Sequence, residues 1–262
     1  GNHTLLGRSL DLLTEHIEHS ATATTIETIT RALSATQWKR IEQGRSDIYL
    51  HLYEHFLSLY DSQRREKTGS YYTPVEIVDG MVNLTDQALR GYLNRSEGIS
   101  DDSVAVIDPA MGTGTYPLSV LRKVAEQNEK YGAGAAADAV SNMAERLYGI
   151  ELQSGPFSVA ELRVSQAVSE LGGSLPEGGL NLFVADTLED PSATETKKLS
   201  YTLQLLAEQR HKANKVKLNT DIQVCIGNPP YDDKAKGKGG WVESGNGLKN
   251  SHALADDFKQ PG

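Results

Sequence analysis

The stretch VAVIDPAMGTGT, residues 104–115, decides the fold class of this chain of 262 residues. Its first four residues are apolar and mostly β-branched, which predicts a short buried strand that ends at Asp108. The small residues that follow let the backbone approach a bound molecule closely, and a helix is predicted from about Tyr116. A strand, a glycine-rich turn and a helix in this order predict the first unit of an α/β sheet.

On its own, the glycine-rich turn is compatible with a nucleotide site or with a tight strand-to-helix turn. It is not a phosphate-binding loop, because no Gly-Lys-Ser/Thr sequence follows it. It is not the dinucleotide fingerprint either, because Pro117 stands where the third glycine would be.

Three further strands are predicted downstream, with helices between them. The strands cover residues 147–150, 182–185 and 222–226, and helices are predicted at about 154–171 and 200–213. This alternation predicts a mostly parallel, doubly wound sheet with helices on both of its faces.

An acidic residue closes each of the first three strands, namely Asp108, Glu151 and Asp186, and the amide Asn228 follows the fourth. Ligands bind at the edge where the carboxyl ends of parallel strands meet, so these four side chains are expected in one cleft. A carboxylate at Glu151 suits a ribose diol, and one at Asp186 suits an adenine amine. The structural alternative for both is the capping of the next helix. S-adenosylmethionine, a nucleoside joined to an amino acid without phosphates, fits such a pocket.

The tetrapeptide Asn228-Pro229-Pro230-Tyr231 carries the sharpest chemical signal. Its two prolines fix the backbone and lack amide donors, so their carbonyls remain as acceptors beside the carbonyl of Asn228. Acceptors held in this way can take both hydrogens of an amine on a planar ring and localise its lone pair for attack on a methyl group. Tyr231 offers a flat face on which the ring can stack. The structural alternative is an Asn-Pro turn after a strand.

Upstream of the first strand the chain is predicted to be helical. Residues 1–67 form a predicted N-terminal helical region, and residues 68–262 form the α/β domain. A helix is predicted from Thr73 to about Leu93, because Thr73-Pro74-Val75-Glu76 has the pattern of a capping box with proline at the first helical position.

The composition bounds the class of protein. Hydrophobic residues make up 38% and charged residues 23%, as in soluble proteins, and no apolar run is long enough to span a membrane. A single cysteine, Cys225, excludes an internal disulfide and favours a cytoplasmic setting; it is predicted to lie in the core.

The net charge of −9 counts mildly against nucleic-acid binding, and the lysine-rich stretch 197–238 is most simply a solvated helix and loop.

Together these motifs resemble the amino-methyltransferases of DNA, and closely their adenine-N6 branch. Residues 108–114 look like the family's cofactor loop, and residues 228–231 look like its catalytic motif in the form typical of adenine enzymes. The segment TGSYYTP, residues 68–74, is similar to the motif that closes over the methionine end of the cofactor. The resemblance extends over residues 45–235 and is to large, single-polypeptide restriction–modification enzymes.

The resemblance implies a Rossmann-like methyltransferase fold that uses S-adenosylmethionine, with C-terminal strands and the target-recognition domain missing from this chain. It implies that Asn228 and the carbonyl of Pro229 hold the amine of an adenine flipped out of double-stranded DNA, while Tyr231 stacks on the base. Glu151 and Asp186 would hold the ribose and adenine of the cofactor. Its methionine end would lie among Tyr72, Thr73, Pro74, Asp108, Ala110, Gly112, Thr113 and Gly114. No metal is expected.

The function expected from the resemblance is site-specific methylation of adenine N6 in DNA, within a restriction–modification or phage-defence system. Nuclease or translocase domains are expected in the same polypeptide. Two alternatives stay open: a methyltransferase that acts on RNA or a protein glutamine, and a non-catalytic DNA-binding module of a defence complex. Residues 68–74 argue against the first, and the intact tetrapeptide argues against the second. A cytosine-C5 enzyme is disfavoured, because Cys225 follows valine rather than proline.

Overall fold

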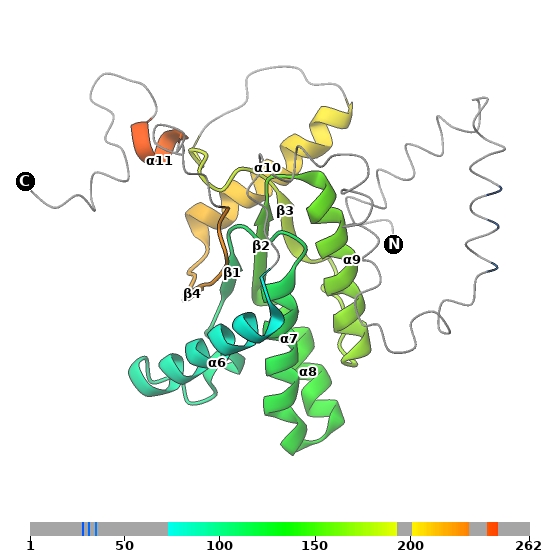
Figure 1. The fold of residues 1–262 in the computed structure, drawn as a ribbon, viewed down its shortest axis with the longest axis vertical. Coiled ribbons are helices and arrows are strands. Elements are labelled where there is room, and N and C mark those ends of the chain that lie inside the picture. The colour runs from blue at the N-terminus through cyan, green and yellow to red at the C-terminus, as the bar shows by residue number, and fades with distance from the viewer. Residues whose placement is uncertain are drawn as a thin grey trace, which may run out of the picture. The chain divides into compact units, whose positions relative to one another are not determined.

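The computed structural model in Figure 1 describes residues 28, 31, 35, 73–192, 201–230 and 240–245. The chain divides into two compact units, Gly1–Ser62 and Gln63–Gly262, and the fold below belongs to the second unit. Apart from three helical residues, the predicted N-terminal helical region lies outside the described residues. Two residues of the predicted site, Tyr72 and Tyr231, also lie outside them.

Four parallel strands form one sheet in the order β3-β2-β1-β4. The strands are β1 (Val106–Asp108), β2 (Leu147–Glu151), β3 (Asn181–Val184) and β4 (Val224–Cys225). The chain moves outward from β1 to β3 and then returns to the other side of β1. The strand order therefore reverses between β1 and β4, and in sheets of this kind the ligand cleft lies at the carboxyl ends of the strands where the order reverses. The predicted doubly wound parallel sheet is confirmed.

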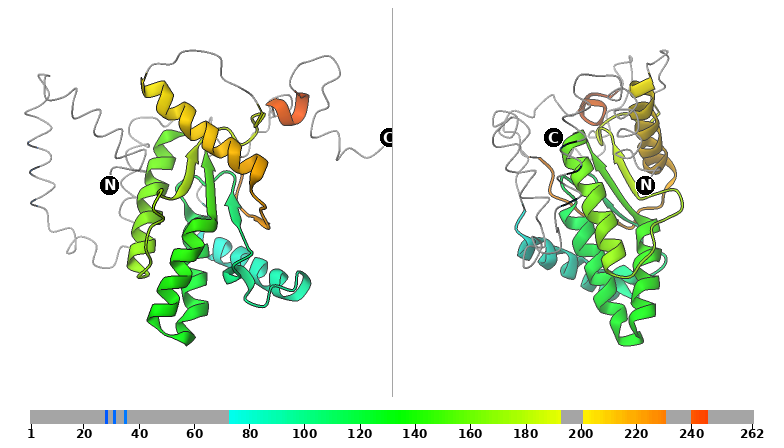
Figure 2. Two further views of the ribbon diagram at one scale, coloured as in Figure 1. Left: turned by 180° about the vertical axis from the view of Figure 1, so that it is seen from behind. Right: turned by 90° about the vertical axis from the view of Figure 1, so that its right-hand side faces the viewer.

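Helices cover both faces of the sheet. Figures 1 and 2 show α10 (Tyr201–Asn219) on one face, and α7 (Thr115–Asn128), α8 (Ala133–Arg146) and α9 (Ser154–Glu170) on the other. Helix α6 (Val75–Tyr92) packs against α7. The short elements are η1 (Gly98–Ser100), η2 (Glu129–Tyr131) and α11 (Gly240–Ser244). Helix α8 was not predicted, whereas α6, α7, α9 and α10 lie where the sequence predicts helices.

The α10 face has its own apolar core. Ile150 and Phe183 of the sheet are buried there against Ala213 and Val216 of α10. On the other face, fully buried side chains of α7, α8 and α9 pack together and against the sheet; they include Val120, Val140, Phe157 and Val164. Within the described residues, no helix combines the length and the apolar character that a bilayer span requires.

The prediction that Cys225 belongs to the core is wrong. Cys225 lies in β4 as expected, but its side chain is exposed. It pairs in register with Ile107, so both side chains face α10, whose buried contacts are with β2 and β3. Because β4 is the last strand on its side of the described sheet, α10 leaves Cys225 uncovered.

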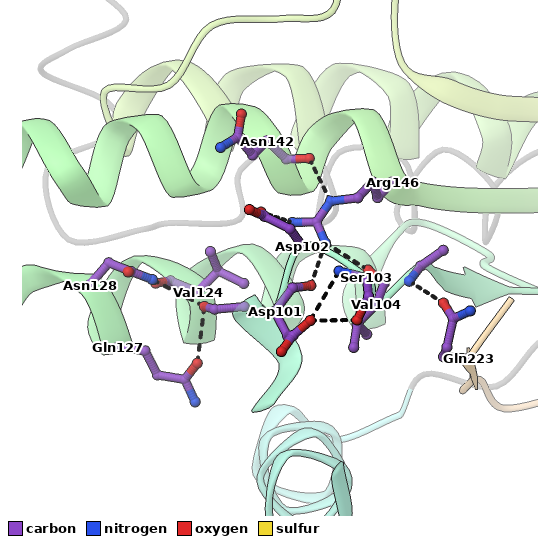
Figure 3. A network of polar contacts seen from close by, with 12 residues as sticks. Asp101, Asp102, Ser103, Val104, Val124, Gln127, Asn128, Asn142, Arg146 and Gln223 are labelled. Carbon is purple, nitrogen blue, oxygen red and sulfur yellow. Dashed lines mark hydrogen bonds and ion pairs between the residues drawn. The ribbon is translucent and has the colours of Figure 1, made fainter. Parts of the chain in front are cut away.

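A polar network holds the segment that enters β1 (Figure 3). Arg146, at the end of α8, donates from Nη1 to the carbonyls of Asp101 (2.5 Å) and Val104 (3.0 Å). The amide of Ala105 donates to Oε1 of Gln223 at 2.7 Å, which ties the start of β1 to the segment before β4. These contacts fix the amino ends of the central strands, at the opposite edge from the predicted cleft.

Candidate active site

The loop after β1 folds back onto β2. The amide of Met111 donates to the carbonyl of Ile150 at 3.0 Å, and the amide of Gly114 donates to the carbonyl of Met111 at 2.8 Å. The Met111 side chain occupies the space beside Gly149, where an added Cβ would lie 2.4 Å from its sulfur. At Gly112, by contrast, φ is +54° and an added Cβ would meet nothing within 4 Å. The loop is thus anchored to β2 through Met111, while the backbone of Gly112 stays open to a ligand.

Glu151, at the end of β2, anchors this loop. Its side chain is buried, with Oε2 accepting from the amide of Gly112 at 3.0 Å and Oε1 accepting from the amide of Gln153 at 2.8 Å. Burial raises the pKa of the Glu151 carboxyl, and the backbone hydrogen bonds oppose this rise. A carboxylate has about four acceptor sites, so these bonds leave acceptor capacity for a ligand. Glu151 is not the cap of α9, because the N-cap residue is Gln153 and no side chain caps this helix. Its carboxyl holds the amide of Gln153 and can still accept from a ribose.

Asp108 is the most deeply buried acid of the cleft, at 2% exposure. Its Oδ1 accepts from the amide of Ala110 at 3.1 Å, and its buried Oδ2 has no hydrogen-bond partner among the described residues. Burial raises the pKa of Asp108 to about 7, the Ala110 amide lowers it, and the nearby charge of Glu151 raises it further. A buried acceptor without a partner is costly, so Oδ2 marks a place where a donor from a ligand would be stabilising.

We expect the raised pKa of Asp108 to appear in the pH dependence of stability. The folded chain holds this proton more tightly than the unfolded chain, whose ordinary value is 3.8. The stability that protonation provides is therefore lost as the pH rises from about 4 toward 7. Asp108→Asn, which cannot ionise, should gain in melting temperature over wild type across this window, with the gain levelling off above pH 7. Thermal unfolding at several pH values tests this, with the exposed Asp138→Asn as the control. A difference that does not change with pH would contradict it.

The loop after β3 is tied to the loop after β1. The hydroxyl of Thr187 donates to the carbonyl of Pro109. Asp186 is exposed; its Oδ1 accepts from the amide of Leu188 at 2.9 Å, and its carbonyl accepts from Nζ of Lys217 at 2.7 Å. The side chain of Asp186 therefore accepts within its own turn, not at the start of the next helix, which begins at Tyr201, and it remains open to solvent.

Two apolar side chains near the acids were missed by the sequence interpretation. Leu152, directly after Glu151, is 67% exposed, and Leu188, two residues after Asp186, is 45% exposed. Both follow the carboxyl ends of parallel strands, the edge at which ligands bind in such sheets, so they offer apolar surface there. Their positions after the strands can be found in the sequence once the strand ends are known, but their exposure comes from the structure.

Asn228, after β4, makes a contact that the sequence interpretation did not anticipate. Its Nδ2 donates to Oγ1 of Thr73 at 2.9 Å, across 155 positions of sequence. The predicted capping box at Thr73 is wrong: α6 begins at Val75, its N-cap is Pro74, and no side chain caps it. The carbonyl of Pro74 instead accepts the first two helical amide bonds, those of Ile77 (3.0 Å) and Val78 (3.2 Å). Thr73 thus lies one residue before the N-cap position of α6, and its hydroxyl oxygen instead accepts the hydrogen bond from Asn228.

Gly227 joins the two loops of the cleft and was also missed. An added Cβ at this position would lie 2.4 Å from Oδ1 of Asp108 and 3.3 Å from Cδ of Pro109. The Asp108 carboxyl therefore packs against the backbone that leads into Asn228. Pro229 and Pro230 follow with exposed side chains. The structure thus brings Thr73, Asp108 and Asn228 together at the carboxyl edge of β1 and β4.

A family model for N-6 DNA methylases matches residues 44–241 of the chain. The chain belongs to the N-6 DNA methylase family. The matched range contains every cleft residue described above. No curated protein matches the chain.

Solved structures share the fold of this N-6 DNA methylase family member. The DrdV–DNA complex is 22% identical, with a TM-score of 0.64 over 88% of this chain and 22% of that chain. The Type ISP restriction-modification enzyme LlaBIII bound to DNA is 24% identical, with a TM-score of 0.56 over 78% of this chain and 13% of that chain. A nuclease-deletion mutant of the Type ISP enzyme LlaGI, with a DNA substrate mimic, is 23% identical, with a TM-score of 0.52 over 68% and 14%. The chain thus spans less than a quarter of the length of each.

Gly227 offers a direct test of how the two loops of this N-6 DNA methylase chain fit together. Gly227→Ala would place a methyl group inside the contact with Asp108, so we expect lower thermal stability and a displaced Asn228. The destabilisation should be about 1–3 kcal/mol, as for other overpacked sites. Chemical unfolding provides the measurement, and Gly134→Ala in α8, where an added Cβ meets nothing within 4 Å, is the control. Equal stability of Gly227→Ala and wild type would show that the contact is loose.

Proposed function

We propose that this chain is the catalytic part of a site-specific DNA methyltransferase that transfers a methyl group from S-adenosylmethionine to the N6 amine of adenine. One observation carries this proposal: the Asn-Pro-Pro-Tyr motif begins beside the buried acid of the glycine-rich loop. The contact between Gly227 and Asp108 joins the two loops. A cofactor bound on the loop and a base held by the motif would therefore be neighbours.

The residues of the cleft fit S-adenosylmethionine. Its ammonium group is a donor that suits the buried Oδ2 of Asp108, which has no partner among the described residues. Glu151 has acceptor sites left for a ribose diol. Leu152 and Leu188 offer exposed apolar surface for the faces of the adenine ring, and Asp186 offers a carboxylate for its amine. We assign the methionine end to the remaining loop positions Ala110, Gly112, Thr113 and Gly114, with Tyr72, Thr73 and Pro74 as their cover.

The chemistry assigned to the chain is the activation of an amine. The carbonyl oxygens of Asn228 and Pro229 accept the two hydrogens of the adenine amine, which localises the nitrogen lone pair toward the methyl group. Pro230 keeps the backbone rigid and adds no donor. Tyr231 stacks on the base. When bound, the cofactor supplies the methyl group; a nitrogen–carbon bond forms as the sulfur–carbon bond breaks, and the nitrogen then loses a proton. The amine is itself the nucleophile, so no covalent intermediate on Cys225 is needed.

The substrate proposed is double-stranded DNA from which the target adenine is extruded, because N6 cannot reach such a pocket inside the duplex. The described cleft is acidic, so the phosphate contacts must come from elsewhere in the protein. We place the protein in the cytoplasm, in a restriction–modification or phage-defence system, with residues 68–262 as the methyltransferase domain and residues 1–67 as a helical region before it. Nuclease or translocase domains in the same polypeptide are part of this proposal.

The test compares substrates directly. The intact protein is incubated with S-adenosylmethionine labelled in its methyl group and with unmethylated genomic DNA, ribosomal RNA or peptide release factors. The proposal predicts label in DNA and none in the other two. Label in RNA or in a protein glutamine would identify a different substrate for the same motif, and cofactor binding without any transfer would indicate a non-catalytic module.

A further inference from the structure

Thr73 and Asn228 are joined by a hydrogen bond that neither the cofactor pocket nor the helix requires. The bond is 2.9 Å long, from Nδ2 of Asn228 to Oγ1 of Thr73, and both side chains are partly buried. It spans 155 positions of the sequence and connects the segment before α6 to the loop after β4. The helix does not need Thr73 as a cap, because α6 has Pro74 as its N-cap residue.

The proposed reaction makes a specific demand on Asn228: its carbonyl oxygen, not its nitrogen, must meet the target amine. The χ2 torsion of an asparagine is broad and roughly two-fold, so an untethered carboxamide exchanges its acceptor for its donors by rotation. A flipped carboxamide would present N–H donors to an N–H donor. The bond to Thr73 uses the nitrogen of Asn228 and therefore does not consume the acceptor oxygen.

Thr73 is held well enough to act as an anchor. It precedes α6, where Val78 and Val82 are buried at 0% and 1% exposure. Asp79 of α6 accepts a 2.5 Å hydrogen bond from the hydroxyl of Ser119 in α7. Helix α7 itself begins at Thr115, directly after the glycine-rich loop. The hydroxyl is thus fixed relative to the cofactor loop as well as to Asn228.

We propose that Thr73 is a positioning residue that orients the carboxamide of Asn228, with its nitrogen toward Thr73 and its oxygen toward the target amine. This inference rests on the proposed function, and it gives Thr73 a role distinct from that of a cover over the cofactor. Through Thr73, the segment before α6 aligns the catalytic motif.

The experiment compares Thr73→Val with Thr73→Ser in the intact protein. Valine keeps the shape and loses the hydroxyl, so kcat for methyl transfer should fall about tenfold to a hundredfold, the cost of a small misplacement of a reacting group. Any loss of cofactor affinity should be smaller than the loss of kcat, and serine should restore kcat. Thr85→Val is the matched control, because the Thr85 hydroxyl bonds only locally to the Met81 carbonyl in α6. In an Asn228→Ala background, Thr73→Val should cause no further loss.

Two outcomes would overturn the inference while the proposed function stands: an unchanged kcat in Thr73→Val, or weaker cofactor binding at an unchanged kcat. A second readout does not depend on turnover. The side-chain amide signals of Asn228, assigned by their absence in Asn228→Asp, should shift in the NMR spectrum of Thr73→Val and stay in place in Thr73→Ser. If the wild-type protein transfers no methyl group, the proposed function fails, and unshifted signals would separately remove the contact.

Discussion

Asn228→Ala is expected to reduce methyl transfer by about a hundredfold to a thousandfold, the cost of removing one preorganised polar contact to a reacting group. Cofactor affinity should stay close to wild type, because Asn228 follows β4 and the polar groups assigned to the ribose, adenine and ammonium of the cofactor follow β1, β2 and β3. Methyl incorporation into duplex DNA and calorimetric titration of the cofactor, performed on the same preparation, separate the two effects. Substantial residual transfer in Asn228→Ala would remove the amine-activation role.

Tyr231 provides the contrast to Asn228. Tyr231→Ala removes a stacking surface, worth about 1–3 kcal/mol per base, and should weaken capture of the extruded adenine as well as turnover. Tyr231→Phe keeps the ring and should retain much of the activity. An inactive Tyr231→Phe would show that the hydroxyl takes part in the chemistry.

Glu151→Ala is expected to weaken cofactor binding by about 1–3 kcal/mol, the cost of losing hydrogen bonds to a charged group. The structure adds a second reason for a loss. Both oxygens of Glu151 hold backbone amides, those of Gly112 and Gln153, so the variant also releases the loop that carries the methionine end. Titration of S-adenosylmethionine and of its demethylated product measures the change. Glu177→Ala, at an exposed position between α9 and β3, is the control. Unchanged affinity in Glu151→Ala would place the ribose elsewhere.

The sheet was predictable from the sequence because its strands are short and apolar, and a polar residue ends each one or follows it within three positions. The acids after β1 and β2 stand at the strand ends, as predicted, whereas β3 ends at Val184, two residues before Asp186. One helix was predicted between the first two strands, but the structure has two. Helix α7 and the short η2 are separated from α8 at Gly132, whose φ of +103° is incompatible with a right-handed helix. Gly132 and Gly134 within an otherwise helical pattern did not reveal this break.

The contacts inside the cleft were not predictable from local patterns. The Thr-Pro-Val-Glu pattern of residues 73–76 is the same whether the Thr73 hydroxyl caps α6 or bonds to Asn228. The sequence near Thr73 could not reveal the second partner, because Asn228 lies 155 positions away. Gly227 was not singled out in the sequence, and only the position of the Asp108 carboxyl shows why a side chain cannot fit there. Cys225 was assigned to the core from its strand, but burial depends on which helix covers the edge of the sheet.

The central claim is that the cleft between β1 and β4 methylates adenine N6 in DNA. Its most direct test is mass spectrometry of nucleosides released from duplex DNA after incubation of the intact protein with S-adenosylmethionine carrying a deuterated methyl group. The account predicts deuterated N6-methyldeoxyadenosine with the wild-type protein and little or none with Asn228→Ala. Deuterated N4-methyldeoxycytidine, or no labelled nucleoside from a protein that binds the cofactor, would contradict it.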